Sequence, residues 1–547
     1  MEKLQYMHNP RGSNNRLAED NDNRQNANRL FDSQNNNRGG YNVGDSNAEQ
    51  NGDGRGDSQG QLTYFKTSIL RVEWTNQHGG NNPNVNTQLV FQYTCNDMST
   101  SLWDVGAGND LRDGDGSTNA NNGNTNRITD ESQANYGRHE PQGFFDDCTA
   151  RDRNGGLVVF DQNVGNNARS TRQNAGATAY GFECAEERDY YPYWHPAPWK
   201  DILILTSNTT QCELYQTESQ NVQVKGHCVG ETQYNNPDEC AENGGAWTEE
   251  PAWGIAAPRC EELAFSRDNH LGNSVDGEPL HFNWTIPADI TAGSKCVLRA
   301  RYNISTNDYD NWNTFYMEDE DGNSVYPISN DPNLNILKGT GYSAGVQLNV
   351  NTAQFGRTFQ DRSHVFYVQD RPANIDPAAM IYNLNVRGRR GNIVEVYPSV
   401  EYDYIPRDLH VTPADYVHIQ WTGSLSSPDG NGQGAAETDK NNMVCIAKAG
   451  DSIPLMYSDP ACTMFTSLDQ HIKYATAGYA GTPDTVDELL NNIPATFNNA
   501  ADAELIQPGG GALGEYHFLN TRNNHFTNRA QKGAIYVVPG PLIVHTV

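Results

Sequence analysis

The sequence predicts an all-β protein made of tandem β-sandwich domains with long loops rich in asparagine and glycine. Three observations predict this class. Short alternating or apolar strings typical of strands recur along the chain, beginning with residues 69–74 and 88–93. Long amphipathic helical patterns are absent. Hydrophobic residues make up only 36% of the 547 residues, which leaves many residues for loops and turns.

The order of these signals divides the chain into three regions. Residues 1–60 are crowded with Asn, Asp and Arg, and we expect an extended polar arm because little there can form a core. Residues 61–390 form the β-sandwich region, and residues 391–547 form a last domain. Further strand-like strings of the middle region lie at residues 282–286, 296–302 and 364–368. The middle region also contains an insertion at 211–262, whose four closely spaced cysteines predict a small disulfide-rich unit.

The charge balance excludes two classes of partner. The chain has 38 Lys and Arg residues against 68 Asp and Glu residues, a net charge of −30. Binding to nucleic acid needs clustered basic residues, and an anionic membrane surface selects for them too. No run of about 18 apolar residues is present for a membrane span. The partners we expect are other copies of the chain, glycans or other extracellular proteins.

Cysteines and glycosylation sequons together favour a secreted or cell-surface protein. Asn208, Asn283 and Asn303 each begin an N-x-S/T sequon, and we expect all three to be glycosylated. The cysteines are even in number, and we expect them all to be oxidised: Cys95, Cys148, Cys184, Cys212, Cys228, Cys240, Cys260, Cys296, Cys445 and Cys462. A cytoplasmic protein with reduced cysteines is the alternative.

One disulfide is predicted from spacing. Cys445 and Cys462 are the two cysteines that follow Cys296, so neither has a nearer partner. We expect them to pair within the last domain, where such a bridge typically stabilises the fold by about 2–4 kcal/mol.

The last domain resembles the cupredoxins, which are small blue-copper β-sandwiches. The strings that carry the resemblance are residues 404–406, 409–411 and 415–421 at the start, and 516–519 and 533–537 at the end. The resemblance implies a sandwich that closes with a strand, a ligand loop and a final strand.

The copper ligands are missing from this predicted domain. Blue copper needs a cysteine thiolate, two imidazoles and usually a weak thioether. Aligning the strands places Asn442 and Asn523 at the two histidine positions, Asn520 at the cysteine position and Asn528 near the methionine position. His525 remains in the loop, but one imidazole does not hold this copper. We therefore expect no metal, no other cofactor and no electron transfer.

Most of the chain resembles an uncharacterised secreted protein family, first described in a cellular slime mould and also present in oomycetes and other protists. The strings that carry the resemblance are residues 8–17, 27–34, 183–196, 355–364 and 383–392. The resemblance implies secretion and brings no established activity.

The richest candidate site runs from Glu186 to Trp199. There the adjacent Glu186 and Glu187, with Arg188 and Asp189, precede Tyr190, Tyr191, Tyr193, Trp194, His195 and Trp199. Paired carboxylates beside aromatics occur in glycosidases, and exposed aromatic faces stack on sugar rings. We favour a third interpretation, an aromatic cluster packed under a loop that three prolines stiffen.

Two further patterns are weaker candidates for metal sites, one for copper and one for calcium. Residues 297–302 are similar to a strand of lytic polysaccharide monooxygenases, and His8 and His78 loosely resemble their copper-binding region. However, His8 is internal, so its amide nitrogen cannot act as the amino ligand of such a site. The acidic turn at residues 318–323 is a calcium candidate because hard cations prefer carboxylate oxygens, but a solvated charge run is the interpretation we prefer.

The sequence thus predicts a non-enzymatic, secreted structural or adhesive glycoprotein that assembles with itself into a matrix, surface coat or filament. A carbohydrate-binding or copper-dependent polysaccharide-active protein is the alternative.

Overall fold

The computed structural model confirms the all-β class. Strands dominate the described residues, and the α-helices are short. The structure describes residues 5–10, 12–14, 62–76, 85–97, 191–193, 195–230, 234, 236–263, 279–306, 357–363, 366–388, 402–421, 440–479, 505–521 and 531–540, with short pieces at 158–159, 162–163, 317–318, 324–325, 334–335, 337, 339–342, 345–346, 485, 493–494 and 497.

An eight-stranded sheet forms one layer of the N-terminal sandwich. Its strands are β11 (Arg259–Glu262), β8 (Lys200–Thr206), β5 (Val85–Cys95), β13 (Lys295–Thr306), β18 (Arg357–Ser363) and β2 (Gly12–Asn14), followed by β19 (Phe366–Gln369) and β3 (Leu62–Phe65), which join through β13. The central strand β5 is buried from Thr87 to Cys95, polar residues included. A strand covered on both faces needs this nearly continuous burial.

The second layer belongs to a six-stranded sheet. Its strands are β1 (Gln5–Asn9), β4 (Ile69–Asn76), β12 (His281–Thr285), β20 (Ile381–Gly388), β21 (Tyr402–Ile405) and β23 (Tyr416–Ile419). Phe282 and Trp284 on β12 point into the sandwich core, as the alternation of the strand predicts. The ring centroid of Phe91 lies 4.7 Å from that of Phe282 and 4.8 Å from that of Trp74, which joins the two layers.

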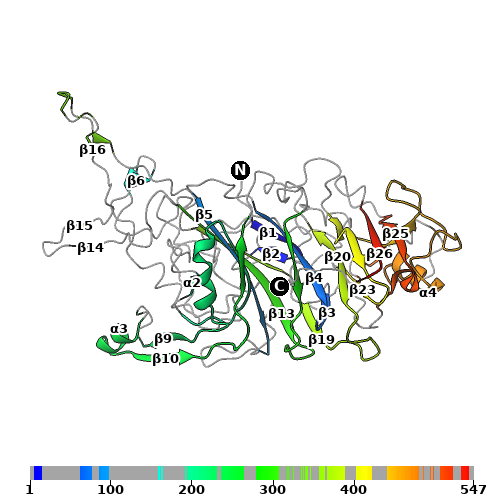
Figure 1. The fold of residues 1–547 in the computed structure, drawn as a ribbon, viewed down its shortest axis with the longest axis horizontal. Coiled ribbons are helices and arrows are strands. Elements are labelled where there is room, and N and C mark those ends of the chain that lie inside the picture. The colour runs from blue at the N-terminus through cyan, green and yellow to red at the C-terminus, as the bar shows by residue number, and fades with distance from the viewer. Residues whose placement is uncertain are drawn as a thin grey trace.

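A four-stranded sheet completes the C-terminal sandwich. Its strands are β22 (Asp408–Val411), β26 (Lys532–Val537), β25 (Gly514–Leu519) and β24 (Val444–Ile446), and helix α4 (Leu468–Ala475) packs beside them. Tyr404 of β21 meets Phe518 of β25 edge to face, with centroids 4.8 Å apart. The strands β20, β21 and β23 therefore form the opposite layer. Figure 1 shows the C-terminal sandwich in yellow to red at one end of the molecule.

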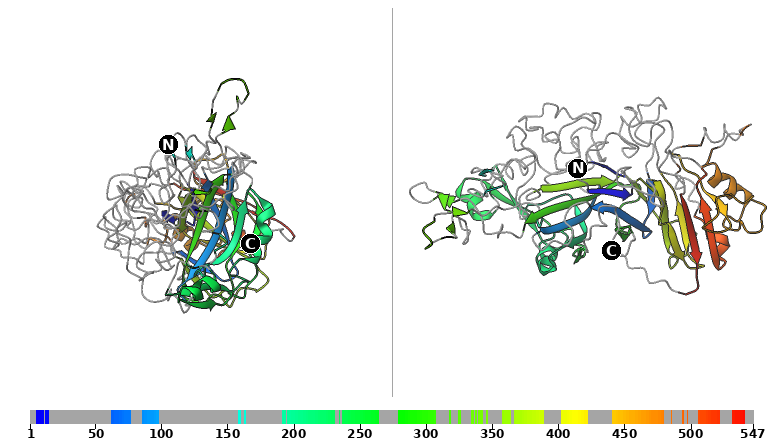
Figure 2. Two further views of the ribbon diagram at one scale, coloured as in Figure 1. Left: turned by 90° about the vertical axis from the view of Figure 1, so that its left-hand side faces the viewer. Right: turned by 90° about the horizontal axis from the view of Figure 1, so that it is seen from above.

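The six-stranded sheet runs from one sandwich into the other. Ile69 of β4 pairs with Tyr382 of β20, and β20 pairs in turn with β21 and β23. The sheet thus crosses the expected boundary at residue 391, because β20 precedes that residue and its partners β21 and β23 follow it. Figure 2 shows the two sandwiches side by side along the long axis.

Buried amides close the junction between the sandwiches. The side chain of Gln420 bonds the backbone of Thr63 twice, accepting from its N–H at 3.0 Å and donating to its carbonyl at 2.8 Å. Asn385 donates to the hydroxyl of Tyr64 at 2.9 Å. Each of these polar groups is buried, so each needs such a partner.

Two pieces of the expected polar arm are strands of the sheets. β1 pairs with β4, and β2 pairs with β18. Met7, His8 and Asn9 are fully buried, and Asn9 donates to the carbonyl of Arg71 at 2.6 Å. These strands could not be predicted from local sequence, because residues 1–60 are polar in composition. Their burial depends on pairing with strands that lie far away in the sequence.

The insertion adds short helices and a two-stranded sheet beside the N-terminal sandwich, and Tyr215 anchors it in the sandwich core. It contains helices α2 (Cys212–Thr217) and α3 (Pro237–Glu242), the 3-10 helix η5 (Thr209–Gln211) and the hairpin of β9 (Lys225–Val229) and β10 (Ala246–Glu250). The remaining short elements are β6 (Val158–Val159), β7 (Gln162–Asn163), β14 (Met317–Glu318), β15 (Ser324–Val325), β16 (Leu334–Asn335), β17 (Gly345–Val346) and η9 (Pro508–Gly511).

Four disulfides lie in the described chain, in the N-terminal sandwich, the insertion and the C-terminal sandwich. They join Cys95 to Cys296, Cys212 to Cys260, Cys228 to Cys240, and Cys445 to Cys462. The first links the neighbouring strands β5 and β13, the next two hold the insertion, and the last lies in the C-terminal sandwich. Cys148 and Cys184 lie outside the described residues.

Candidate functional site: an amide cluster and a junction pocket

The position predicted for a copper site holds a cluster of amides. Asn442 precedes β24 and Asn520 follows β25, and the Asn442 N–H donates to the Asn520 side-chain oxygen at 3.2 Å. The Asn442 amide donates to the Thr521 hydroxyl at 2.7 Å and to the Ala475 carbonyl at 2.9 Å. Its oxygen accepts from the Thr521 N–H at 2.8 Å.

A second ring of bonds surrounds Asn520. Its amide donates to the side-chain oxygens of Asn441 at 3.1 Å and of Gln531 at 2.8 Å. All three residues are buried. Neutral amides that bond one another and the backbone are not the thiolate and imidazoles of a blue-copper centre, so copper does not fit these residues. Asn523, His525 and Asn528 lie outside the described residues.

One cluster in the described residues has metal-like spacing. Ligand atoms of Cys445, Cys462 and His471 lie within 4.8 Å of one another. Both sulfurs belong to the disulfide, so neither is a thiolate that binds a metal. The Nδ1 of His471 lies 3.8 Å from the sulfur of Cys462, and burial lowers the pKa of this histidine. The short distances in this cluster therefore result from the packing of His471 against the disulfide, and they do not define a metal site.

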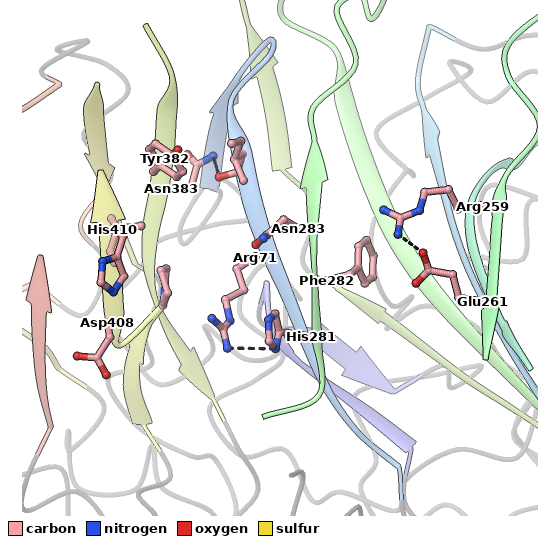
Figure 3. A pocket seen from close by; sticks show the side chains of 13 residues that line it. Arg71, Arg259, Glu261, His281, Phe282, Asn283, Tyr382, Asn383, Asp408 and His410 are labelled. Carbon is pink, nitrogen blue, oxygen red and sulfur yellow. Dashed lines mark hydrogen bonds and ion pairs between the residues drawn. The ribbon is translucent and has the colours of Figure 1, made fainter. Parts of the chain in front are cut away.

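A pocket of about 400 Å³ lies where the two sandwiches meet, and we call it the junction pocket (Figure 3). It opens between β4 and β12 of the N-terminal sandwich and β22 of the C-terminal one. The lining residues are Ile69, Arg71, Arg259, Glu261, His281, Phe282, Asn283, Tyr382, Asn383, Pro406, Asp408, Leu409 and His410. Its volume is at the lower end of the range of about 300–1,000 Å³ that is typical of small-molecule sites.

Charged and polar side chains line the mouth of the junction pocket. Figure 3 shows Arg71 and His281 pointing toward each other below Asn283, with 3.1 Å between an Arg71 guanidinium nitrogen and His281 Nδ1. Asp408 and His410 approach from β22 on the opposite side. His281, Asp408 and His410 are exposed. The mouth thus offers donors, acceptors and charges of both signs, which suits a polar ligand better than an apolar one.

The aromatic segment is packed, as we favoured from the sequence. Tyr191, Tyr193 and Trp199 are each less than a tenth exposed, and the ring of His195 stacks on that of Tyr193. Rings covered in this way are not a platform for sugars. Glu186, Glu187, Arg188, Asp189, Tyr190 and Trp194 lie outside the described residues.

The aromatic segment covers a buried polar cluster that the sequence analysis missed. Arg299 lies flat on the ring of Trp199, 3.6 Å from its centroid, and donates to Gln92 at 2.8 Å. Gln92 donates to the carboxylate of Asp201 at 2.6 Å, and Arg301 donates to the hydroxyl of Tyr193 at 2.9 Å.

Burial raises the pKa of Asp201, and hydrogen bonds from neighbours such as Ser219 oppose the rise. A buried carboxyl that accepts hydrogen bonds from Gln92, Tyr191 and Ser219 is typical of a structural network. Only the two arginines at 299 and 301, which follow the apolar residues 296–298 of the same strand, signalled such a network in the sequence.

The remaining predicted residues are spread over the molecule. His8 is buried in β1, and His78 lies outside the described residues. The Asn208 side chain caps η5 and accepts from the Thr210 hydroxyl at 2.6 Å. Asn303 lies in β13, of which only the backbone is described at that point. Apart from Glu318, which ends β14, the acidic turn at residues 318–323 is outside the described residues.

The fold and these sites define a disulfide-bonded β-sandwich protein with a cupredoxin-like C-terminal domain. Residues 5–368 match the family model of the DD3-3 N-terminal domain, and residues 379–537 match that of the DD3-3 cupredoxin-like domain. The chain therefore belongs to the DD3-3 N-terminal domain family. No curated protein and no solved structure matches it.

Proposed function

We propose that the protein is a secreted structural or adhesive glycoprotein without catalytic activity, which assembles with itself into a matrix, surface coat or filament. The observation that carries the proposal is the amide cluster around Asn442 and Asn520. These side chains lie where a cupredoxin would bind copper. They form hydrogen bonds with each other and with neighbouring loops, and amide groups carry out no redox chemistry.

Other features agree with a scaffold outside the cell. Four disulfides in the described chain are typical of extracellular proteins. No helix in the described part is long and apolar enough to cross a membrane. The continuous sheet and buried amides of the junction favour a stiff two-sandwich unit, which suits a repeating subunit.

Self-assembly is tested by changing the arm while keeping its strands. Because β1 and β2 belong to the sheets, residues 15–60 are replaced by a Gly/Ser segment of equal length. We expect the purified full chain to form large assemblies in sedimentation and electron micrographs, and the variant to remain a folded monomer, because an arm that docks on the next subunit has been lost. A full chain that stays monomeric at high concentration would overturn the proposal.

The junction pocket favours one alternative, a carbohydrate-binding protein, since its polar mouth suits sugars. The two proposals differ in what titration with free oligosaccharides shows. Saturable binding that is lost in Arg71→Ala would support the alternative, and its absence together with assembly would support the structural role.

A further inference from the structure

We propose that Asn283 carries an N-linked glycan whose first sugar occupies the junction pocket and braces the two sandwiches against each other. The inference rests on the proposed extracellular location. Asn283 begins the sequon Asn283-Trp284-Thr285, and it is also one of the residues that line the pocket. In the modification, the Asn283 amide nitrogen loses a proton and bonds the anomeric carbon of the sugar, which leaves its lipid diphosphate carrier.

Strand geometry places the sequon on the correct face. Phe282 and Trp284 are buried in the core, at 8% and 2% exposure, while Asn283 and Thr285 are half-buried. Side chains two apart on a strand share one face. The acceptor amide and the sequon hydroxyl therefore both lie on the outer face of the six-stranded sheet, where the pocket is.

The pocket suits a sugar, which has polar edges and an apolar ring face. Arg71 and His281 stand beside Asn283, and Asp408 and His410 of β22 also line the pocket (Figure 3). The His410 ring is held by stacking on Tyr536, with centroids 4.7 Å apart. Leu409 adds apolar surface. Hydroxyl and acetamido groups thus find donors and acceptors on both sides of the pocket.

The order of synthesis allows the pocket to close around the sugar. Asn283 lies more than a hundred residues before Asp408 and His410. Domains fold as units in order of synthesis, so a glycan added to the emerging chain is in place before β22 arrives. The C-terminal sandwich then packs against the sugar and covers it.

Matched variants separate the sugar from the side chain. Thr285→Val abolishes the sequon and leaves Asn283 in the pocket, while Thr285→Ser keeps the sequon. Thr210→Val removes the sequon of Asn208, which is the N-cap of η5 and does not line the pocket. We expect glycopeptide mass spectrometry to find sugar on Asn283 in the wild type and in Thr285→Ser only. The thermal midpoint should fall in Thr285→Val relative to Thr285→Ser. It should fall less in Thr210→Val, which loses only the exposed hydrogen bond from the Thr210 hydroxyl to Asn208.

The location of the sugar is tested by its release from the native protein with an amidase that cuts the bond to asparagine. Release from Asn283 should be at least about tenfold slower than from Asn208, the ratio expected when contacts worth about 1.4 kcal/mol must open first. Denaturation should abolish the difference, and His410→Ala should reduce it.

Equal rates of release from the native protein, or a bare Asn283 beside a glycosylated Asn208, would overturn the inference while leaving secretion intact. Absence of sugar from both asparagines would contradict secretion as well. If Thr285→Val does not fold, the release experiment on the wild type still decides.

Discussion

Replacing Arg387 with methionine is expected to lower the free energy of unfolding by about 3–5 kcal/mol, because it leaves two buried carboxylates without their cation. Arg387 on β20 forms an ion pair with Glu73 of β4, and its other terminal nitrogen lies 3.5 Å from Asp403 of β21. All three side chains are less than a tenth exposed. The ion pair with Glu73 crosses the junction, so urea unfolding should show the loss in the transition that separates the sandwiches.

Two comparisons make this experiment decisive. Lys66→Met removes a surface ion pair with Asp370, which is 72% exposed, and should cost less than about 1 kcal/mol. A triple variant that combines Arg387→Met with Glu73→Gln and Asp403→Asn removes all three charges and should recover much of the stability. A loss in Arg387→Met no larger than in Lys66→Met would show that the buried ion group does not support the junction.

Acid is expected to destabilise the protein through His418. This residue of β23 is fully buried beside the ring of Phe65, and its Nδ1 donates to the Asn383 side-chain oxygen at 3.1 Å. Burial lowers its pKa from 6.5 to about 3. Because the folded pKa is the lower one, the stabilisation is present above pH 6.5 and is lost as the pH falls toward 3.

The size of the effect follows from the pKa difference. At pH 4.5 the unfolded histidine has gained its proton and the folded one has not, which costs about 3 kcal/mol relative to neutral pH. The measurement is the free energy of unfolding between pH 7 and 4.5 for the wild type and for His418→Gln. We expect a steeper fall in the wild type by about that amount, and identical slopes would refute the role of His418.

Asp403 works in the opposite direction in the same range. Burial raises its pKa from 3.8 to about 6 against the opposing charge of Arg387. A carboxyl with a raised folded pKa contributes stability below 3.8 that is lost as the pH rises through about 6. The difference between the wild type and His418→Gln cancels this contribution, since both proteins contain Asp403.

Local patterns in the sequence predicted several of the long strands correctly. The strings at 69–74, 88–93 and 296–302 all lie in strands, and so does 409–411 in the last domain. These segments alternate or are continuously apolar, which is what half-buried and fully buried strands require. The cysteine-rich insertion was also visible, because closely spaced cysteines in a weakly apolar stretch signal a stapled unit.

The elements that the sequence did not predict depend on contacts with distant parts of the chain. β1 is too polar to be read as a strand, and its burial comes from pairing with β4, some seventy residues later. Helix α4 is only eight residues long and buries only Tyr474, so it is too short to stand out as a helical pattern in the sequence, although Ser467 caps it. Neither β1 nor α4 can be predicted from local sequence, because tertiary contacts stabilise both elements.

The junction pocket was missed for the same reason. Arg71, His281 and His410 come together only because β4, β12 and β22 meet at the junction. The alternation of buried and half-buried residues in β12 places Asn283 on the outer face of the sheet, but nothing local in the sequence shows that β22 lies beside it. The amide cluster differs, since the alignment with cupredoxins already pointed to Asn442 and Asn520, and the structure brings these two residues together.

The most direct test of a copper-free, non-redox scaffold is the copper content and colour of the purified protein after incubation with Cu(II) and removal of excess metal. The account predicts less than stoichiometric copper and no intense blue band, since Asn520 supplies an amide where the thiolate would stand. A blue protein that retains one copper per chain would contradict it, because a thiolate would then have to bind copper in a domain whose Cys445 and Cys462 form a disulfide.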